Sequence, residues 1–368
     1  MAVTAKEIAQ KLGISTASVS VALNGKPGVS RATREKVLAA AKELGYVPPH
    51  GAEGQTLCFL IYLDEAVGVA QASSFYTFVL QGVEAAAKEL GYRVLIRYYH
   101  AGQDFDAQLR DIWDDLAGLL VLGTDFTAAR RGEILSLLTC AGSPRPVVVL
   151  DSLVLSAYVD CVGNDNLYGA KSAVSYLIDQ GHRRICYLRA RQRIANFDDR
   201  EHGVRMAVSE HLPHAPDALT VLDVDITAER AYRELLEAID PARLPDAFFS
   251  ENDVVAAAAI RALTAKGISV PGDVSVMGFD DIPICEMVEP TLTTVHAFKE
   301  TLGAEAVGLL HRRIQRGQSV QDAQAAGLIK LSLSTRIVER QSVAPLTGNA
   351  AARKPPLGAQ GEVARCKP

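Results

Sequence analysis

The chain has 368 residues, too many for one ordinary hydrophobic core, so we expect two or three folding units. Its 48% hydrophobic and 22% charged residues are typical of a soluble α/β protein, and its formal net charge is -5. No apolar run comes near the ~20 residues that a membrane-spanning helix needs, and the first residues, MAVTAKEIAQKLG, lack the apolar stretch of a secretory leader. We therefore expect a cytoplasmic protein.

The six cysteines are scattered along the chain and form no C-x-x-C pair. This spacing favours reduced thiols, mostly in a core, over a disulfide framework or a metal site. We expect neither a metal nor a cofactor. The cysteines are Cys58, Cys140, Cys161, Cys186, Cys285 and Cys366.

The negative net charge does not exclude a nucleic-acid partner, because the charge is unevenly distributed. Residues 1–50 contain seven basic and three acidic side chains, which gives them a formal charge of +4, while the rest of the chain carries -9. A basic end on an acidic body is expected when only that end meets phosphate. An ordinary solvated helical surface could carry the same charge, so the sequence of the segment must decide.

The first fifty residues predict three short helices. Thr4 and Glu7 form a T-x-x-E capping box at the start of the first helix, which runs to Leu12 and is ended by Gly13. Ser15 caps a second helix that continues to about residue 24. The connection between these two helices is only a few residues long, as in a helix-turn-helix.

A third helix follows the loop of residues 24–28, NGKPG. Ser30 caps it, and Gly45 with two prolines shortly after Tyr46 ends it. Apolar side chains at helical spacing on all three helices predict one small shared core, which is the organisation of a DNA-reading head. They are Ile8, Ala9, Leu12, Ala17, Val19, Ala22, Leu23, Val37, Leu38, Ala41 and Leu44.

From residue 57 onward, apolar runs alternate with amphipathic segments. We expect strands at 57–63, 92–98, 116–123 and 146–151, and then at 183–188, 220–224, 246–250 and 273–280. Continuous rather than alternating hydrophobicity indicates strands buried on both faces, and hence parallel sheets covered by helices. Two such series, with chain crossings near 157–162 and 287–293, would form two lobes around a ligand cleft at the strand ends.

The run VTAKEIAQKLGISTASVSVALNGKPGVSRATREKVLAAAKELGYVP resembles the head of the lactose-repressor (LacI/GalR) family almost position for position. The match is highly specific, because it joins the helix-turn-helix, the A-L-N-G loop and the terminal L-G-Y-x-P in one register. The resemblance continues through the body to about Ala344. It implies an α/β protein with a three-helix helix-turn-helix head and a two-lobed body, with parallel sheets, like that of periplasmic binding proteins.

The resemblance divides the chain into four parts. We expect a DNA-binding head at 1–49, a short linker at 50–56, a ligand-sensing and dimerising body at 57–344, and a disordered tail at 345–368. Within the body, lobe one is expected at about 57–158 and 291–317, and lobe two at about 159–290 and 318–344. The segment AVGLLHRRIQRG should be a late helix of lobe one, and LSTRIVERQS the closing strand of lobe two.

In this family the second helix of the head lies in the major groove, so the resemblance places Thr16 and Ala17 against base edges. Hydroxyl and amide side chains around it are expected to bind phosphates. These are Thr4, Ser15, Ser18, Ser20, Asn24 and Ser30. Ser15 and Ser30 also fit the role of helix caps, and the two roles are compatible.

Two features depart from the family pattern. Val21 stands where many relatives have an arginine, so base readout by Thr16, Ala17 and Val21 is expected to depend on apolar contact and DNA shape. The linker VPPHGAEGQT is shorter than in relatives and lacks their A-R-x-L segment. We therefore do not expect the hinge helix that relatives insert into the minor groove.

For the body, the resemblance places seven side chains in the cleft. Arg200, in NFDDREHGVR, is the strongest candidate, because a guanidinium has paired donors that suit vicinal hydroxyls or a carboxylate. Asn252 is assigned to the cleft with Asp253 as a helix cap, and Asp280 to the cleft with Asp281 in a structural role. The effector-binding candidates are Phe75, Tyr76, Asp151, Asn196, Arg200, Asn252 and Asp280.

Other roles stay open for several of these residues. The two aromatic candidates could be core residues at a helix start, Asp151 could cap a turn, and Arg200 could pair with Asp198 or Asp199 on the surface. Ile226 stands where several relatives have an aromatic side chain, so we expect weaker stacking on a ligand there. The ligand could be a sugar, a sugar phosphate, a nucleobase or another small polar metabolite.

The sequence therefore predicts a homodimeric transcriptional regulator, in the first place a repressor, that binds a pseudo-palindromic operator in double-stranded DNA and responds to a small polar effector, a sugar first. It would be associated with the nucleoid when bound to DNA. An activator or dual regulator of the same family is the alternative. An enzyme on a Rossmann-like fold is disfavoured because no dinucleotide, phosphate-loop or nucleophile motif is found, so no catalytic residue is expected. The head opposes a pure sugar-binding module.

Overall fold

The computed structural model describes residues 4–23, 28–44, 54–72, 74–104, 112, 115–130, 132–135 and 145–346. Most of the expected linker, the tail beyond residue 346, and Asn24 lie outside the described residues, so the expectations about the hinge helix and the disordered tail are not tested. Among the described helices, none has the length and apolar character needed to cross a membrane.

The head consists of three helices, α1 (Ala5–Leu12), α2 (Thr16–Leu23) and α3 (Arg31–Leu44). The Glu7 carboxylate accepts hydrogen bonds from the backbone N–H of Thr4, at 2.6 Å, and from its hydroxyl, at 3.1 Å. Gly13 follows α1 with a φ of 65°, a left-handed conformation that favours glycine and ends the helix.

One apolar centre is shared by the three helices of the head. Its buried members are Ile8, Ala9, Val19, Ala22, Val37, Ala40 and Ala41. Two side chains expected in this core lie outside it: Ala17 is exposed and Leu38 is 49% exposed. Leu38 follows Val37 by one residue, and a helix turns by about 100° per residue, so the two cannot share the inward face.

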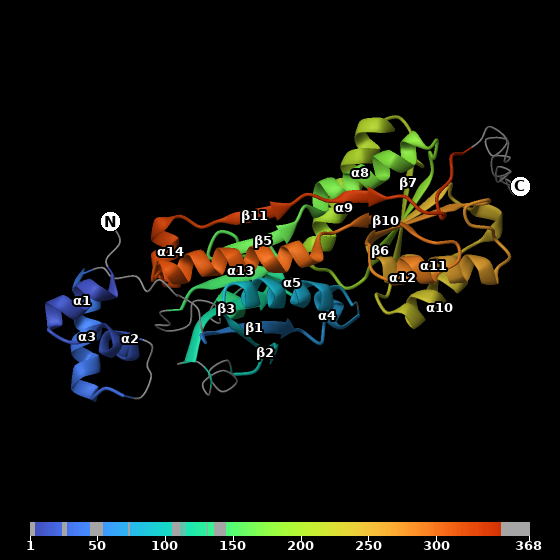
Figure 1. Ribbon diagram of the computed structural model, residues 1–368. Helices are drawn as coiled ribbons and strands as arrows, with labels where there is room; N and C mark the ends of the chain where they lie inside the picture. The colour runs from blue at the N-terminus through green and yellow to red at the C-terminus, as the bar shows by residue number, and fades with distance from the viewer. Residues whose placement is uncertain are drawn as a thin grey trace, which may run out of the picture.

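The body contains two six-stranded sheets that form two lobes (Figure 1). In lobe one the strand order is β11-β5-β4-β3-β1-β2, and all five strand pairs are parallel. The strands are β1 (Thr56–Leu63), β2 (Arg93–His100), β3 (Leu116–Leu122), β4 (Val147–Leu150), β5 (Asp160–Asn164) and β11 (Lys330–Leu333). Helices α5 (Phe75–Glu89) and α13 (Lys299–Gln315) pack on one face, with short α4 (Val69–Ala72), η2 (Ala128–Arg130) and α14 (Val320–Ala326) completing the lobe.

In lobe two the strand order is β12-β10-β9-β8-β6-β7, and only the edge strand β12 is antiparallel to its neighbour. The strands are β6 (Ile185–Ala190), β7 (Leu219–Val224), β8 (Ala247–Ser250), β9 (Ser275–Asp280), β10 (Thr293–His296) and β12 (Arg336–Val338). Helices α8 (Asn166–Asp179) and α9 (Ala195–His211) cover one face, and α10 (Ala228–Ala238) and α11 (Asp253–Ala265) the other. The short elements are η4 (Pro241–Arg243) and α12 (Ile284–Met287).

The division of the chain between the lobes differs from the sequence expectation. β5 was expected in lobe two but pairs with β4 and β11 of lobe one, and β10 was expected in lobe one but pairs with β9 of lobe two. The chain returns to lobe one at α13 and stays there through α14 and β11, where lobe two was expected. The polar ends of β5, DCVGN, and the polar threonines and histidine of β10, TTVH, hid both strands from a search for apolar runs.

The helices α8 and α9 approach each other closely at Gly203. A Cβ atom at this position would lie 2.1 Å from the carbonyl oxygen of Leu167 on α8, a contact that side chains do not make. Gly203 is three residues after Arg200 in the motif that the sequence singled out. The glycine of that motif therefore lets α9 lie against α8, and so fixes the position of Arg200.

Candidate functional sites

A pocket lies between the two lobes, where strands of both sheets end. All seven effector-binding candidates line it, so the structure brings together residues from β4, α5, α9, α11 and β9 or the turns that adjoin them. The complete lining is Val69, Ala70, Phe75, Tyr76, Thr124, Asp151, Ile194, Asn196, Phe197, Arg200, Ile226, Asn252 and Asp280.

Arg200 lies at the centre of the polar side of this pocket and is 4% exposed. Its Nε donates to the side-chain oxygen of Asn166 at 2.8 Å, and one terminal nitrogen donates to Oδ1 of Asp280 at 2.9 Å. The other terminal nitrogen donates to the main-chain carbonyl of Glu251. Below the guanidinium lies the ring of Phe279, with 3.7 Å between Cζ and the ring centroid.

These contacts decide between the two roles considered for Arg200. It is buried and paired inside the lobe rather than with Asp198 on the surface, since Asp198 binds Arg193. Three fixed partners hold the guanidinium in one orientation. A buried guanidinium held this way can present a defined edge to a ligand.

Asp151 and Asp280 end strands β4 and β9 and are 4% and 6% exposed. Both have positive φ angles, 56° and 112°, in a region that side chains other than glycine rarely adopt. The Thr124 hydroxyl donates to Asp151 at 2.7 Å. Burial raises the pKa of Asp151 to about 7, and burial likewise raises the pKa of Asp280 although Arg200 and Lys299 oppose the shift.

Asn196 connects the two walls of the pocket. It lies in the first turn of α9 in lobe two, and its Nδ2 donates to the main-chain oxygen of Asp151 at 2.9 Å and to Oδ1 at 3.2 Å. Asp151 belongs to lobe one. These bonds therefore depend on how the lobes are closed, which suits a residue that senses a ligand between them.

Asn252 has a role that differs in part from the sequence expectation. It lines the pocket, but it is also the N-cap of α11, because its Oδ1 accepts from the backbone N–H of Val255 at 2.8 Å. The cap role expected for Asp253 is therefore wrong. Asp253 is the first residue of the helix, fully buried, and accepts from Ile282 N and Thr294 Oγ1. Asp281 faces away from the pocket lining and binds His296 and Arg340.

The remaining surface of the pocket is mainly apolar. Phe75 is the first residue of α5, and both roles considered for it apply, since it joins the lobe-one core and lines the pocket. Tyr76 is half-buried and also lines it. A small cluster crosses between the lobes and contains Ile226, the position expected to lack an aromatic ring. Its members are Val67, Val69, Ala190, Ile194, Phe197 and Ile226.

Sequence reasoning missed several residues of the site. Thr124 holds Asp151, and it is the second residue after β3, so the rule that functional side chains follow parallel strands could have found it. Phe197 lies between two candidates already chosen, at positions 196 and 200. Asn166 could not have been found this way, because it starts α8 and acts by holding Arg200.

In the head, α2 presents the face expected to meet DNA. Thr16, Ala17 and Ser20 are exposed, and Ser18 and Val21 are half-buried. Thr4 and Ser30 are exposed near the starts of α1 and α3. Ser15 and Ser30 act as caps, since their hydroxyls accept from the backbone N–H of Ser18 at 3.0 Å and of Thr33 at 3.1 Å.

The described residues contain no group of three or more histidine, cysteine, aspartate or glutamate side chains that could hold a metal ion. Cys58, Cys161, Cys186 and Cys285 are buried free thiols, and the other two cysteines lie outside the described residues.

Two family models match the chain: bacterial regulatory proteins of the lacI family at residues 4–49, and the periplasmic binding protein-like domain at residues 174–343. The HTH-type transcriptional regulator CelR of Thermobifida fusca is 32% identical over 349 residues, which cover 92% of this chain and 98% of the relative. The ribose operon repressor of Escherichia coli K12 is 30% identical over 341 residues, covering 92% and 99%.

Solved structures agree with these matches. A complex of the transcriptional regulator CelR with cellobiose has a TM-score of 0.64 at 28% identity and covers 92% of this chain and 99% of its own. A lac repressor dimer bound to operator has the same fold, with a TM-score of 0.65 at 21% identity, covering 94% and 100%.

A helix-turn-helix head joined to a two-lobed binding-protein body defines a DNA-binding transcriptional regulator, not an enzyme. The chain belongs to the lacI family of bacterial regulatory proteins. Both the expected fold class and the family resemblance are confirmed.

Proposed function

We propose that this chain is a transcriptional repressor that binds its operator as a homodimer and is controlled by a neutral sugar in the cleft between its lobes. The observation that carries this proposal is the convergence of Arg200, Asp280, Asp151, Asn196 and Asn252 on one pocket with apolar walls. Fixed donors and acceptors between apolar side chains suit a polyhydroxylated ring. The relatives named for cellobiose and ribose support the choice of a sugar.

The charges of the pocket favour a neutral ligand over a sugar phosphate. Two carboxyl groups, of Asp151 and Asp280, line the pocket with one guanidinium, and that guanidinium already binds Asp280. Among the described residues of the lining, an anion would therefore meet no unpaired cation and would lie against two carboxyl groups. Neutral hydroxyls, in contrast, can donate to the carboxylates.

In this proposal, α2 lies in the major groove with Thr16, Ala17 and Val21 towards the bases, and the neighbouring hydroxyls bind phosphates. The two heads of a homodimer occupy the half-sites of a pseudo-palindromic operator, and the protein acts in the cytoplasm, on the nucleoid. Sugar binding changes the closure of the lobes and thereby the affinity for DNA. Such coupling is typically worth ~1–3 kcal/mol.

A thermal-shift screen tests the ligand class. D-ribose, D-glucose and cellobiose are compared with ribose 5-phosphate and adenine, and we expect a neutral sugar to raise the melting temperature of the full-length chain. Arg200→Ala should abolish that shift and leave operator affinity unchanged, whereas Arg205→Ala, an exposed arginine on the same helix that pairs with Glu201, should preserve both. A shift produced only by the phosphorylated sugar would refute the assignment to a neutral ligand.

Gel-shift titrations test the DNA-binding role. Operator affinity of the full-length chain should fall steeply and linearly in log–log form as the salt concentration rises, because lysine and arginine side chains of the head displace counterions from phosphates. Absence of DNA binding even at low salt would remove the proposed function.

A further inference from the structure

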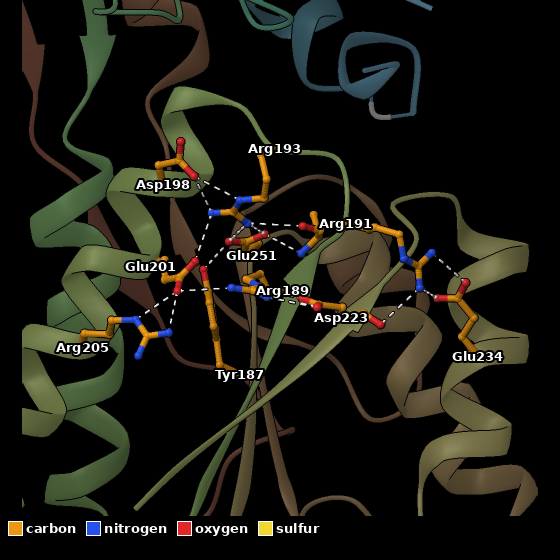
Figure 2. Close-up of polar contacts among 11 residues, drawn as sticks. Tyr187, Arg189, Arg191, Arg193, Asp198, Glu201, Arg205, Asp223, Glu234 and Glu251 are labelled. Atoms are coloured by element: carbon orange, nitrogen blue, oxygen red, sulfur yellow. Dashed lines mark hydrogen bonds and ion pairs between the residues drawn. The ribbon is translucent and has the colours of Figure 1, made fainter. Parts of the chain in front are cut away.

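Arginines stand at every second position from 189 to 193, at the end of β6 and just after it. Each of them is paired with acidic side chains (Figure 2). Arg189 binds Asp223 at 2.6 Å, and Arg191 binds Glu234 at 3.0 Å; the acidic partners of both are 48% and 35% exposed. Pairs of this kind in contact with water contribute little to stability. They do not explain why the third arginine, Arg193, has a buried partner.

The partner of Arg193 is Glu251, whose side chain is 1% exposed. One guanidinium nitrogen of Arg193 donates to both carboxylate oxygens, at 2.7 and 2.9 Å. The backbone N–H of Ala190 donates to Oε2 at 2.6 Å, and the hydroxyl of Tyr187 also donates to this carboxylate. Figure 2 shows Glu251 between Arg193 and Tyr187.

Glu251 is linked to the pocket through its main chain and through its side chain. Its main-chain carbonyl accepts from Arg200, and the next residue, Asn252, lines the pocket. Its side chain holds Ala190 and Arg193, the first and the middle residue of the segment 190–196, which runs from the end of β6 into the first turn of α9. That segment supplies Ile194 and Asn196 to the pocket.

Burying the carboxylate of Glu251 costs free energy that apolar packing at the same place would avoid. A buried carboxylate must be compensated, and apolar packing of similar volume is often as stable as a buried ion pair. What the ion pair adds is a fixed position: it holds the middle of the 190–196 segment against Glu251, which directly follows β8. Arg193 also binds Asp198 at 2.9 Å, so it joins the middle of the segment to the first turn of α9.

We propose that Glu251 and Arg193 are positioning residues of the effector site, which hold residues 190–196 so that Asn196 and Arg200 point into the pocket. This inference rests on the proposed function in so far as a ligand binds at Arg200. Neither Glu251 nor Arg193 lines the pocket, so the pair acts through the residues that it holds.

Hydrogen exchange of the unliganded full-length chain tests the positioning without knowledge of the ligand. In Glu251→Gln, the amides of residues 190–200 should exchange about tenfold faster or more, since hydrogen bonds to a charged group are lost. Amides of α10 should exchange as in the unchanged protein. Arg193→Met should give the same local effect and Arg193→Lys a smaller one, because lysine keeps the charge. The matched control is Glu210→Gln on α9, which removes an exposed ion pair with Lys171 of α8. This variant should leave the exchange rates unchanged.

The same variants are then titrated with D-ribose, D-glucose and cellobiose. We expect Glu251→Gln and Arg193→Met to raise the Kd of whichever of these sugars binds by about tenfold, with operator affinity unchanged, and Arg193→Lys to recover part of it. Unchanged exchange at 190–200, or acceleration spread evenly over lobe two, would overturn the positioning role. Failure of all three sugars to bind the unchanged protein would instead count against the proposed function, and the exchange result would still decide the role of the pair.

Discussion

The two walls of the cleft are built by different means. In lobe two, polar side chains are held by one another: Arg200 is bound to Asn166, Asp280 and the main chain at position 251. In lobe one, most of the lining is apolar, and Asp151, which accepts from the Thr124 hydroxyl, is its acidic residue. The lobe-two wall therefore keeps its geometry by itself, whereas the lobe-one wall gains its polar contacts across the cleft when the lobes close.

This difference suggests an order of events on binding. A ligand would first meet the preorganised donors of lobe two, and the apolar wall of lobe one would then cover it, with Asn196 and Asp151 forming the contact between the lobes. Preorganised groups lose little entropy on binding, so they are suited to the first contact.

The largest expected effect comes from breaking the support of the lobe-two wall. Gly203→Ala would place a methyl group 2.1 Å from a backbone oxygen of α8, which α8 and α9 can relieve only by moving apart. Overpacking of this kind costs about 3 kcal/mol or more, or a fall in melting temperature of about 6–12 °C for a body of this size. Thermal unfolding of the full-length chain measures it, and sugar affinity should fall as Arg200 moves with α9.

The control for this variant is Gly308→Ala on α13. Nothing lies within 4 Å of a Cβ atom there, so the same substitution in a helix should be neutral or stabilise by about 0.4–1 kcal/mol. Equal destabilisation by the two variants would show that the close approach of α8 and α9 is not what requires a glycine at position 203.

The pocket itself was more predictable from the sequence than the path of the chain around it. The family resemblance assigned Asp151 and Asp280, which stand at the ends of apolar strands; the ends of parallel strands meet at one edge of a sheet, so these two residues meet in one pocket. The family resemblance assigned Arg200, whose neighbour Gly203 has a packing reason that the sequence alone does not show.

Residues that act through other residues were not predictable in the same way. Asn166 and Glu251 are far from Arg200 in sequence and become its partners only when α8, α9 and β8 are assembled. The strands β5 and β10 escaped for a different reason. They contain polar residues in place of a continuous apolar run, and they are strands because neighbouring strands offer them hydrogen bonds.

A smaller effect is expected from pH, because each lobe contains a buried carboxyl group near the cleft. Burial raises the pKa of Asp151 in lobe one and of Glu251 in lobe two to about 7. Since both values lie above those of the unfolded chain, the folded state binds more protons, and stability is lost as pH rises from about 4 through 7. We expect each group to contribute on the order of 2 kcal/mol to this loss, since one pKa unit equals about 1.4 kcal/mol.

Melting temperatures of the full-length chain between pH 5 and pH 8 measure this loss. Asp151→Asn keeps the shape of the side chain and removes its titration, so the fall between the two pH values should become smaller. The same slope in the variant and the unchanged protein would mean that Asp151 does not take up its proton in this range.

The smallest effect should come from the contact between the walls. Asn196→Ala removes two hydrogen bonds to Asp151 that form across the cleft, and we expect it to cost about 1 kcal/mol of the closed state, or a five- to tenfold weaker affinity for the sugar. The control is Gln324→Ala, which removes one amide hydrogen bond, to the carbonyl of Tyr158, that lies within lobe one away from the pocket. If lobe two alone determined affinity, both variants would bind the sugar as the unchanged protein does, and the apolar wall of lobe one would be a cover without a part in recognition.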